Sequence, residues 1–67
     1  MNDKNNVQRL RWDKNISLEH LARMSGVSKS TIQRIENFEQ EPNRTQMILL
    51  AKALHQPIHI VFDLEHL

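Results

Sequence analysis

The chain of 67 residues contains a single glycine, Gly26, and it lies between two short segments with helical patterning. In the segment before the glycine, Leu18 and Leu21 recur at the spacing of one helical face, and Ser17 is a suitable N-cap. Because glycine adopts the left-handed conformation without steric cost, it is expected to end this helix in a tight turn. The position of Gly26 therefore divides the middle of the chain into two short helices.

The second of these helices is expected to begin directly after the turn. Ser28 is a suitable N-cap, Ile32 and Ile35 share the inward face, and Val27 fits a buried position in the turn. Two short helices joined by a tight turn with glycine form a helix-turn-helix unit, here residues 17–37. In DNA-binding proteins the second helix of this unit enters the major groove.

One helix is predicted before this unit and another after it. Val7 and Leu10 share a face of the first helix, which should end near Asn15, a residue that tolerates the left-handed conformation. Residues 38–42 are a predicted loop, and Asn43 is suited to cap the following helix. That helix carries a stripe at the spacing i, i+3, i+4, i+7, formed by Met47, Leu50, Ala51 and Leu54.

The segment of residues 57–64 is compatible with two structures. Ile58, Ile60 and Phe62 alternate as in a strand, whereas Ile58, Val61 and Phe62 fit a helix begun by Pro57. Periodicity alone leaves both structures open.

Length and composition restrict the class of protein. The chain has room for one domain, expected to be a compact all-α domain of four or five helices over residues 7–67, after a flexible polar segment over residues 1–6. No cysteine is present, which suits the cytoplasm, and no segment resembles a signal peptide or a membrane span. The formal net charge is only +1, so the distribution of basic residues must support any argument for nucleic acid binding.

The residues disfavour an enzyme or a metal protein. There is no cysteine nucleophile and no glycine-rich phosphate loop, and a chain this short hardly encloses a pocket of about 300 Å³ or more. His55 and His59 are one helical turn apart if their segment is helical, but no cysteine or suitable carboxylate accompanies them. We therefore expect surface histidines, no metal site and no cofactor.

Turning the predicted second helix of the unit by 100° per residue leaves an outward arc without an acidic residue. Lysine and arginine donate hydrogen bonds to O6 and N7 of guanine, and glutamine pairs with adenine, so the arc suits the major groove. In isolation such an arc is more often a solvated helix face, but within this unit it is a candidate DNA-reading surface. Its members are Ser30, Gln33, Arg34 and Asn37, with Lys29 at its edge.

The segment LARMSGVSKSTIQRIEN resembles the XRE-type regulators, the family of Cro and the lambda repressor, and the resemblance extends through VQRLRWDKNIS before it and LAKAL after it. The resemblance implies a lambda-repressor-like fold and a prokaryotic transcription regulator, expected to repress as a homodimer on a near-palindromic operator in double-stranded DNA. It assigns base contacts to Lys29, Ser30, Gln33 and Arg34, and phosphate contacts to Ser17, Ser28, Asn37 and Asn43.

The resemblance also assigns Arg11 and Glu36 to a partly buried ion pair that fixes the recognition helix to the scaffold. These two residues are therefore expected to support the structure and not to contact DNA. The alternative is that they are independent surface charges.

The chain departs from the family pattern in several places. Leu18 stands where a glutamine often helps to bind a phosphate. Phe38 replaces the usual glycine after the recognition helix, so Asn37 is expected to be the left-handed residue. The loop contains Glu39 and Glu41 where the family is often basic, and these carboxylates should repel phosphates.

Several apolar residues suggest an interface with a protein. Trp12 lies away from the apolar face of the first helix, and Leu49 occupies a position that is commonly polar in the family. Either residue can be a partner contact, or be covered by a terminal segment of the chain. The first candidates for a dimer contact are in the C-terminal segment, namely Ile58, Ile60 and Phe62.

Two functions compete with that of a repressor. The antitoxin of a toxin–antitoxin pair binds DNA and also covers a toxin. A protein-interaction module keeps the fold without DNA binding, as the acidic loop hints. Apart from DNA and a second copy, the expected protein partner is a toxin or an anti-repressor. Only the interaction module should fail to shift the promoter of its own operon in a gel.

Overall fold

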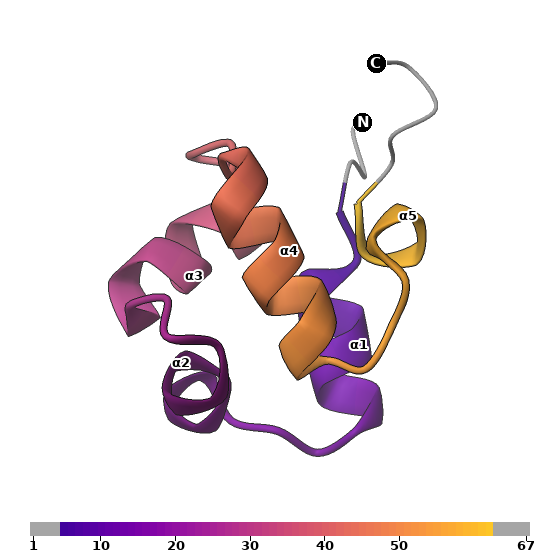
Figure 1. Ribbon diagram of the computed structural model, residues 1–67. Coiled ribbons are helices and arrows are strands. Elements are labelled where there is room, and N and C mark those ends of the chain that lie inside the picture. Colours follow the sequence, from indigo (N-terminus) through magenta and orange to yellow (C-terminus); the bar gives the residue numbers. More distant parts are fainter. Residues whose placement is uncertain (1–4, 63–67) are drawn as a thin grey trace.

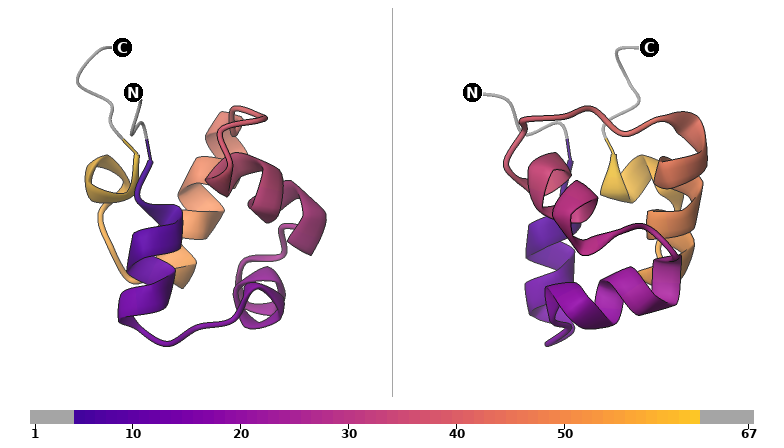
Figure 2. Two further views of the ribbon diagram at one scale, coloured as in Figure 1. Left: turned by 180° about the vertical axis from the view of Figure 1, so that it is seen from behind. Right: turned by 90° about the vertical axis from the view of Figure 1, so that its left-hand side faces the viewer.

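The structure is a computed structural model that describes residues 5–62, and it is all-α as predicted (Figure 1). Its helices are α1 (Val7–Asp13), α2 (Leu18–Ser25), α3 (Lys29–Glu36), α4 (Arg44–Ala53) and α5 (Ile58–Val61). Seen along the view of Figure 1, α4 lies in the middle, with α2 and α3 on one side, α5 on the other and α1 behind (Figures 1 and 2). None of these helices is both long enough and apolar enough to cross a membrane.

The predicted N-caps form at the start of three helices. The side chain of Ser17 accepts a hydrogen bond from the backbone of α2, and that of Ser28 accepts one from the backbone of α3. Asn43 accepts from the backbone N–H of Gln46, and the Gln46 side chain accepts in return from the backbone N–H of Asn43. This reciprocal capping box satisfies two backbone donors that a helix start leaves without partners.

The helix ends agree with the sequence analysis at two positions and differ at a third. Asn15 (φ 57°) and Gly26 (φ 79°) are left-handed as predicted, but Asn37 is not (φ −89°), and Phe38 is (φ 60°). The prediction for Asn37 was wrong because α3 continues to the buried Glu36 and Asn37 is its C-cap. The backbone hydrogen bonds that close the helix are therefore made by the residues after Asn37, and the left-handed residue is Phe38. Phe38 N–H donates to the Ile35 carbonyl, and the next N–H donates to the carbonyl of residue 34.

Apolar side chains from all five helices form one core. The predicted stripe of α4 lies in it, with Leu50, Ala51 and Leu54 buried and Met47 half-buried. Burial of the apolar side chains of the whole core is the main source of stability in so short a chain. The buried apolar residues are Val7, Leu10, Leu21, Val27, Ile32, Ile35, Leu50, Ala51, Ala53, Leu54, Val61 and Phe62.

The C-terminal segment is helical over α5 and then extended at Phe62, which forms an isolated antiparallel bridge with Asn5. This bridge is the one pairing of strand type within residues 5–62. Residues 63 and 64, the end of the ambiguous segment, lie outside the described residues.

Asn5 and Asn6, from the segment expected to be flexible, are hydrogen-bonded to the rest of the fold. Asn6 donates from its backbone to the Val61 carbonyl (2.7 Å) and from its side chain to the Ile60 carbonyl (2.8 Å). The Asn5 amide donates to the Ile35 carbonyl (3.1 Å). These two residues therefore connect the start of α1 both to α5 and to the C-terminal end of α3.

Candidate nucleic-acid interface

The outward arc of α3 is exposed in the structure, as the helical turn of the sequence indicated. Ile32, Ile35 and Glu36 are buried on the opposite face of the helix. The amphipathic pattern therefore turns a set of polar side chains away from the core, and α3 itself lies at the edge of the molecule (Figure 1). The exposed set comprises Lys29, Ser30, Gln33, Arg34 and Asn37.

Two of the predicted base-contacting residues have side-chain partners from neighbouring segments. Lys29 Nζ lies 2.7 Å from Oε2 of Glu19, a residue in the first turn of α2. Arg34 Nε donates to Oε1 of Gln40 (2.9 Å) in the loop before α4. The hydrogen bond from Lys29, helped by a backbone hydrogen bond and by the positive charge of Lys29, lowers the pKa of the Glu19 carboxyl below its ordinary value.

The predicted phosphate-contacting residues lie at helix ends. Ser17, Ser28 and Asn43 are the exposed N-caps of α2, α3 and α4, and Asn37 is the exposed C-cap of α3. The first backbone N–H groups of each helix have no acceptor within the helix, and the positive end of the helix dipole attracts anions. The three N-caps therefore stand where a phosphate group is favoured.

Sequence reasoning missed two charged residues of this region. Arg44 is exposed as the first residue of α4, next to Asn43, and it adds a positive charge just beyond the acidic loop. A basic residue directly after a predicted N-cap was the available signal. Glu19 was missed because its contact with Lys29 spans the turn between two helices, which helical periodicity does not reveal.

The ion pair assigned to Arg11 and Glu36 forms between α1 and α3. Arg11 Nε lies 2.8 Å from Glu36 Oε2, and Nη2 lies 3.0 Å from Oε1, so the contact is bidentate. The side chains are only 9% and 2% exposed, and Arg11 Nη1 also donates to the Ile16 carbonyl (3.0 Å). Both charges are thus enclosed between the scaffold and the inner face of α3, away from its outward arc.

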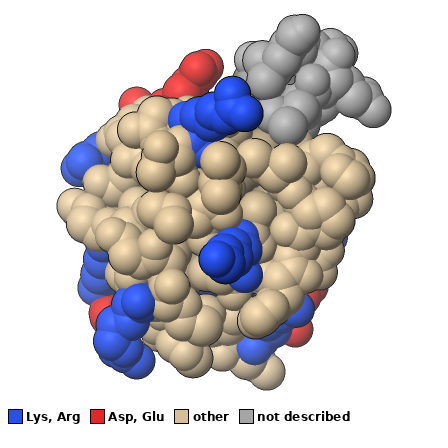
Figure 3. Space-filling model, viewed as in Figure 1, with Lys and Arg blue, Asp and Glu red and all other residues tan. Residues whose placement is uncertain are grey.

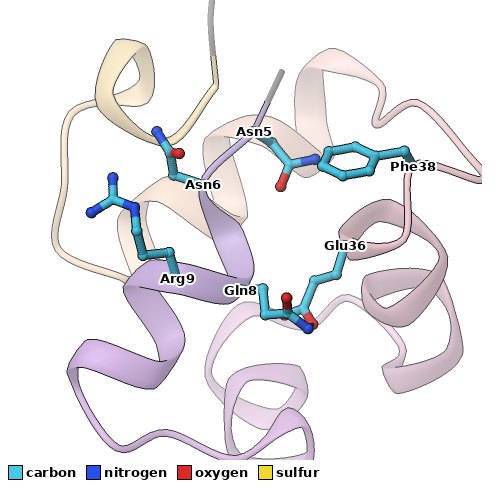
Figure 4. Close-up of a pocket in the computed structure, with 6 residues that line it drawn as sticks. All are labelled: Asn5, Asn6, Gln8, Arg9, Glu36 and Phe38. Carbon is cyan, nitrogen blue, oxygen red and sulfur yellow. The ribbon is translucent and has the colours of Figure 1, made fainter. Parts of the chain in front are cut away.

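An open pocket of about 270 Å³ lies between α1 and the C-terminal end of α3. Gln8 and Glu36 point toward one another across it, with 3.5 Å between Nε2 and Oε1, and Phe38 closes another side (Figure 4). In the described part of the chain every buried side-chain polar atom has a hydrogen-bond partner, so no buried polar atom beside the pocket lacks one. Residues 5–62 also contain no cluster of three or more metal-ligating side chains.

The residues predicted to contact a partner differ in exposure. Trp12 is 61% exposed, so no described segment covers it, and Leu49 and Ile60 are also exposed. Ile58 is half-buried against the core. Phe62 is 3% exposed and packs within the chain's own core, so its prediction as a surface contact does not agree with its place in the structure.

Comparison with known proteins gives a family and a consistent fold. The family model described as HTH_3, helix-turn-helix, matches residues 7–60. The restriction-modification controller protein C.AhdI from Aeromonas hydrophila is similar in structure, with a TM-score of 0.82 and 28% identity over 85% of this chain and 86% of that one.

A second similar structure is an HTH_3 family transcriptional regulator from Vibrio cholerae. Its TM-score is 0.78 with 27% identity, and the match covers 82% of this chain but 31% of that longer chain. No curated protein matches the sequence significantly. With the family model matching most of the chain and α2 and α3 in the expected arrangement, the chain belongs to the HTH_3 helix-turn-helix family of DNA-binding transcription regulators, which are not enzymes.

Proposed function

We propose that this regulator is a cytoplasmic repressor that binds a near-palindromic operator as a homodimer. The observation that carries the proposal is the division of α3 into two faces: an outward face of exposed polar side chains with no acid of its own, and an inward face fixed by the core and by Glu36. In this proposal bases are contacted by Lys29, Ser30, Gln33 and Arg34, and phosphates by Ser17, Ser28, Asn37 and Asn43.

Arg34 is the strongest candidate for base discrimination. Its Nε is bonded to Gln40, which orients the guanidinium and leaves the two Nη groups free of protein acceptors among the described contacts. Two parallel donors match O6 and N7 of guanine, the most frequent specific contact in the major groove. Gln40 thus supports Arg34 from the loop, although the loop also contains two glutamates.

The proposed dimer uses the face formed by α4 and α5. Most of this face is uncharged, with charged side chains around its edge and basic atoms also near its middle (Figure 3). Exposed apolar residues on the two helices are Ile48, Leu49 and Ile60, and their burial against a second copy would remove them from water. A two-fold dimer also places two recognition helices about 34 Å apart, on one face of the duplex.

The similarity to C.AhdI favours a more specific candidate, a controller of restriction-modification genes. The match extends over 86% of that controller protein, so most of its fold has a counterpart here. Footprinting on the promoter of this protein's own operon, with the neighbouring genes identified, tests this candidate. Protection of an operator that lies beside no restriction-modification genes would count against it.

The central experiment compares Arg34→Ala with Asn43→Ala on a library of randomised half-sites. Arg34→Ala should weaken binding to the preferred site by about 1 to 3 kcal/mol and flatten the preference at one base pair in each half-site. Asn43→Ala should weaken binding to all sequences alike, because a phosphate contact does not distinguish bases. Unchanged base preference in Arg34→Ala would show that α3 does not read sequence in the proposed way.

Sedimentation of the free protein and of its operator complex tests the dimer. We expect two copies on the operator, and Leu49→Lys combined with Ile60→Lys should reduce the complex to one copy with weaker binding. One copy of the unmodified protein on a full operator would refute the proposed dimer.

A further inference from the structure

The contact between Lys29 and Glu19 places an acidic group beside the DNA-reading surface. Lys29 is the first residue of α3, and Glu19 comes from the first turn of α2. Nζ and Oε2 are 2.7 Å apart, and the side chains are 51% and 59% exposed. The outward arc of α3 has no acid of its own, so this carboxylate comes from the other helix of the unit.

The electrostatic setting favours the carboxylate at this place. A negative charge is stabilised near the N-terminal end of a helix, and Glu19 lies in the first turn of α2 while its carboxylate reaches the first residue of α3. Lys29 by contrast has its charge at the positive end of its own helix, and α3 has no acidic residue in its first turn to offset it. Glu19 supplies the missing negative charge.

The ion pair has a consequence for how Lys29 meets DNA. A lysine ammonium is a point charge on a flexible stem, and without restraint it can bind any nearby phosphate, which gives affinity without base preference. The ammonium has three N–H donors. If one donor is held by Glu19, two remain for O6 and N7 of a guanine, while the carboxylate repels the phosphates beside it.

We propose that Glu19 is a specificity-determining residue, which acts through Lys29 by holding its ammonium at a guanine edge and away from the DNA backbone. This inference rests on the proposed function, because it requires Lys29 to face the major groove. Glu19 is then a positioning residue that lowers total affinity and raises discrimination between sequences.

The test measures base preference and salt dependence for Glu19→Gln, which has nearly the same shape without the charge. Preference for guanine at the base pair contacted by Lys29 should fall about fivefold or more. About fivefold is the lower end of the discrimination between bases that one good base contact provides. Affinity for non-specific DNA should rise, and the slope of log K against log salt should steepen by about 0.9, as Lys29 neutralises one more phosphate.

Glu41→Gln is the matched control, because it removes the same charge from the exposed loop between α3 and α4 without touching Lys29. It should tighten binding slightly to all sequences and leave the base preference unchanged. Melting curves of both variants, expected to match the parent, show that the fold is intact.

A second comparison introduces Glu19→Gln into a protein that already carries Lys29→Ala. No further change in base preference is expected there, because the proposed effect passes through the ammonium. A further change would overturn the positioning role, and so would an unchanged preference in Glu19→Gln alone. If the parent protein itself shows no base preference, the proposed function fails as well, and the two failures are thus distinguishable.

Discussion

The two ends of α3 are held by ion pairs of nearly the same length but of opposite character. At the C-terminal end, Glu36 meets Arg11 at 2.8 Å with both side chains buried and a second hydrogen bond between them. At the N-terminal end, Lys29 meets Glu19 at 2.7 Å with both side chains more than half exposed. One end of the recognition helix is enclosed in protein, and the other is open to solvent.

This difference shows that distance alone does not decide what an ion pair contributes. Water screens an exposed pair and competes for its hydrogen bonds, whereas removal of one partner of a buried pair leaves a charge without solvation. The buried end fixes the angle of α3 on the scaffold. The exposed end, with Lys29 still paired to Glu19, remains accessible to DNA.

The largest expected effect is at the buried end. Glu36→Ala should destabilise the fold by about 3 to 5 kcal/mol, because it leaves the Arg11 guanidinium buried without its counter-charge. A domain of this length has roughly 3 to 10 kcal/mol in total, so the variant should lose a large share of its stability and melt far below the parent. Urea or thermal unfolding measures the loss.

The double variant Arg11→Met with Glu36→Leu sharpens this prediction. Replacing both charges by apolar side chains of similar size should recover most of the loss. Recovery should be incomplete, because the Ile16 carbonyl loses the hydrogen bond that Arg11 Nη1 donates. A Glu36→Ala variant that melts within a degree or two of the parent would remove the distinction between the two ends.

At the N-terminal end of α3, removal of the Ser28 cap should reduce the free energy of unfolding by less than removal of Glu36 does. The Ser28 side chain accepts from the backbone of Thr31 (3.2 Å) and donates to the Thr31 hydroxyl (2.8 Å). Ser28→Ala should therefore cost about 1 kcal/mol in unfolding free energy. Ser30→Ala, two residues further into the exposed part of the helix, is the control, and it should be neutral or slightly stabilising because alanine favours helices. Equal losses in both variants would contradict the role of the cap.

A substitution in the backbone turn after α3 is expected to stabilise the fold, in contrast to those at Glu36 and Ser28. Phe38 is left-handed at φ 60°, a conformation that is strained for an aromatic residue, and its side chain is half exposed. Phe38→Gly should raise the free energy of unfolding by about 0.5 to 1 kcal/mol. Glycine removes the strain of the left-handed backbone, and this gain exceeds the loss that comes from the greater entropy of glycine in the unfolded chain. Asn37→Gly should instead destabilise, since Asn37 has a negative φ. Reversed signs would restore Asn37 as the left-handed residue.

The smallest expected effect on stability is at the exposed ion pair. Glu19→Gln should leave the melting temperature within about two degrees of the parent, because exposed pairs contribute little to folding. Its effect should appear in DNA binding instead. A clear drop in the melting temperature would mean that the short pair at the open end stabilises the fold after all.

The sequence allowed much of the candidate site to be predicted because its signals are local. Ser17, Ser28 and Asn43 cap their helices through residues three positions away, and the exposed arc of α3 follows from 3.6 residues per turn. Arg11 and Glu36 lie 25 residues apart, and resemblance to a family, not periodicity, indicated their pairing.

What the sequence by itself determined is therefore the set of helices α1 to α4, their caps, the turn at Gly26 and the faces that are buried. The tertiary structure decided the helical form of residues 58–61, the burial of Phe62 and the contact of Asn5 with the end of α3. It also decided that Phe38 is left-handed and that Glu19 meets Lys29. The physical reason is range: caps and periodicity depend on residues within one or two helical turns, whereas these features depend on segments that become neighbours only when the core forms.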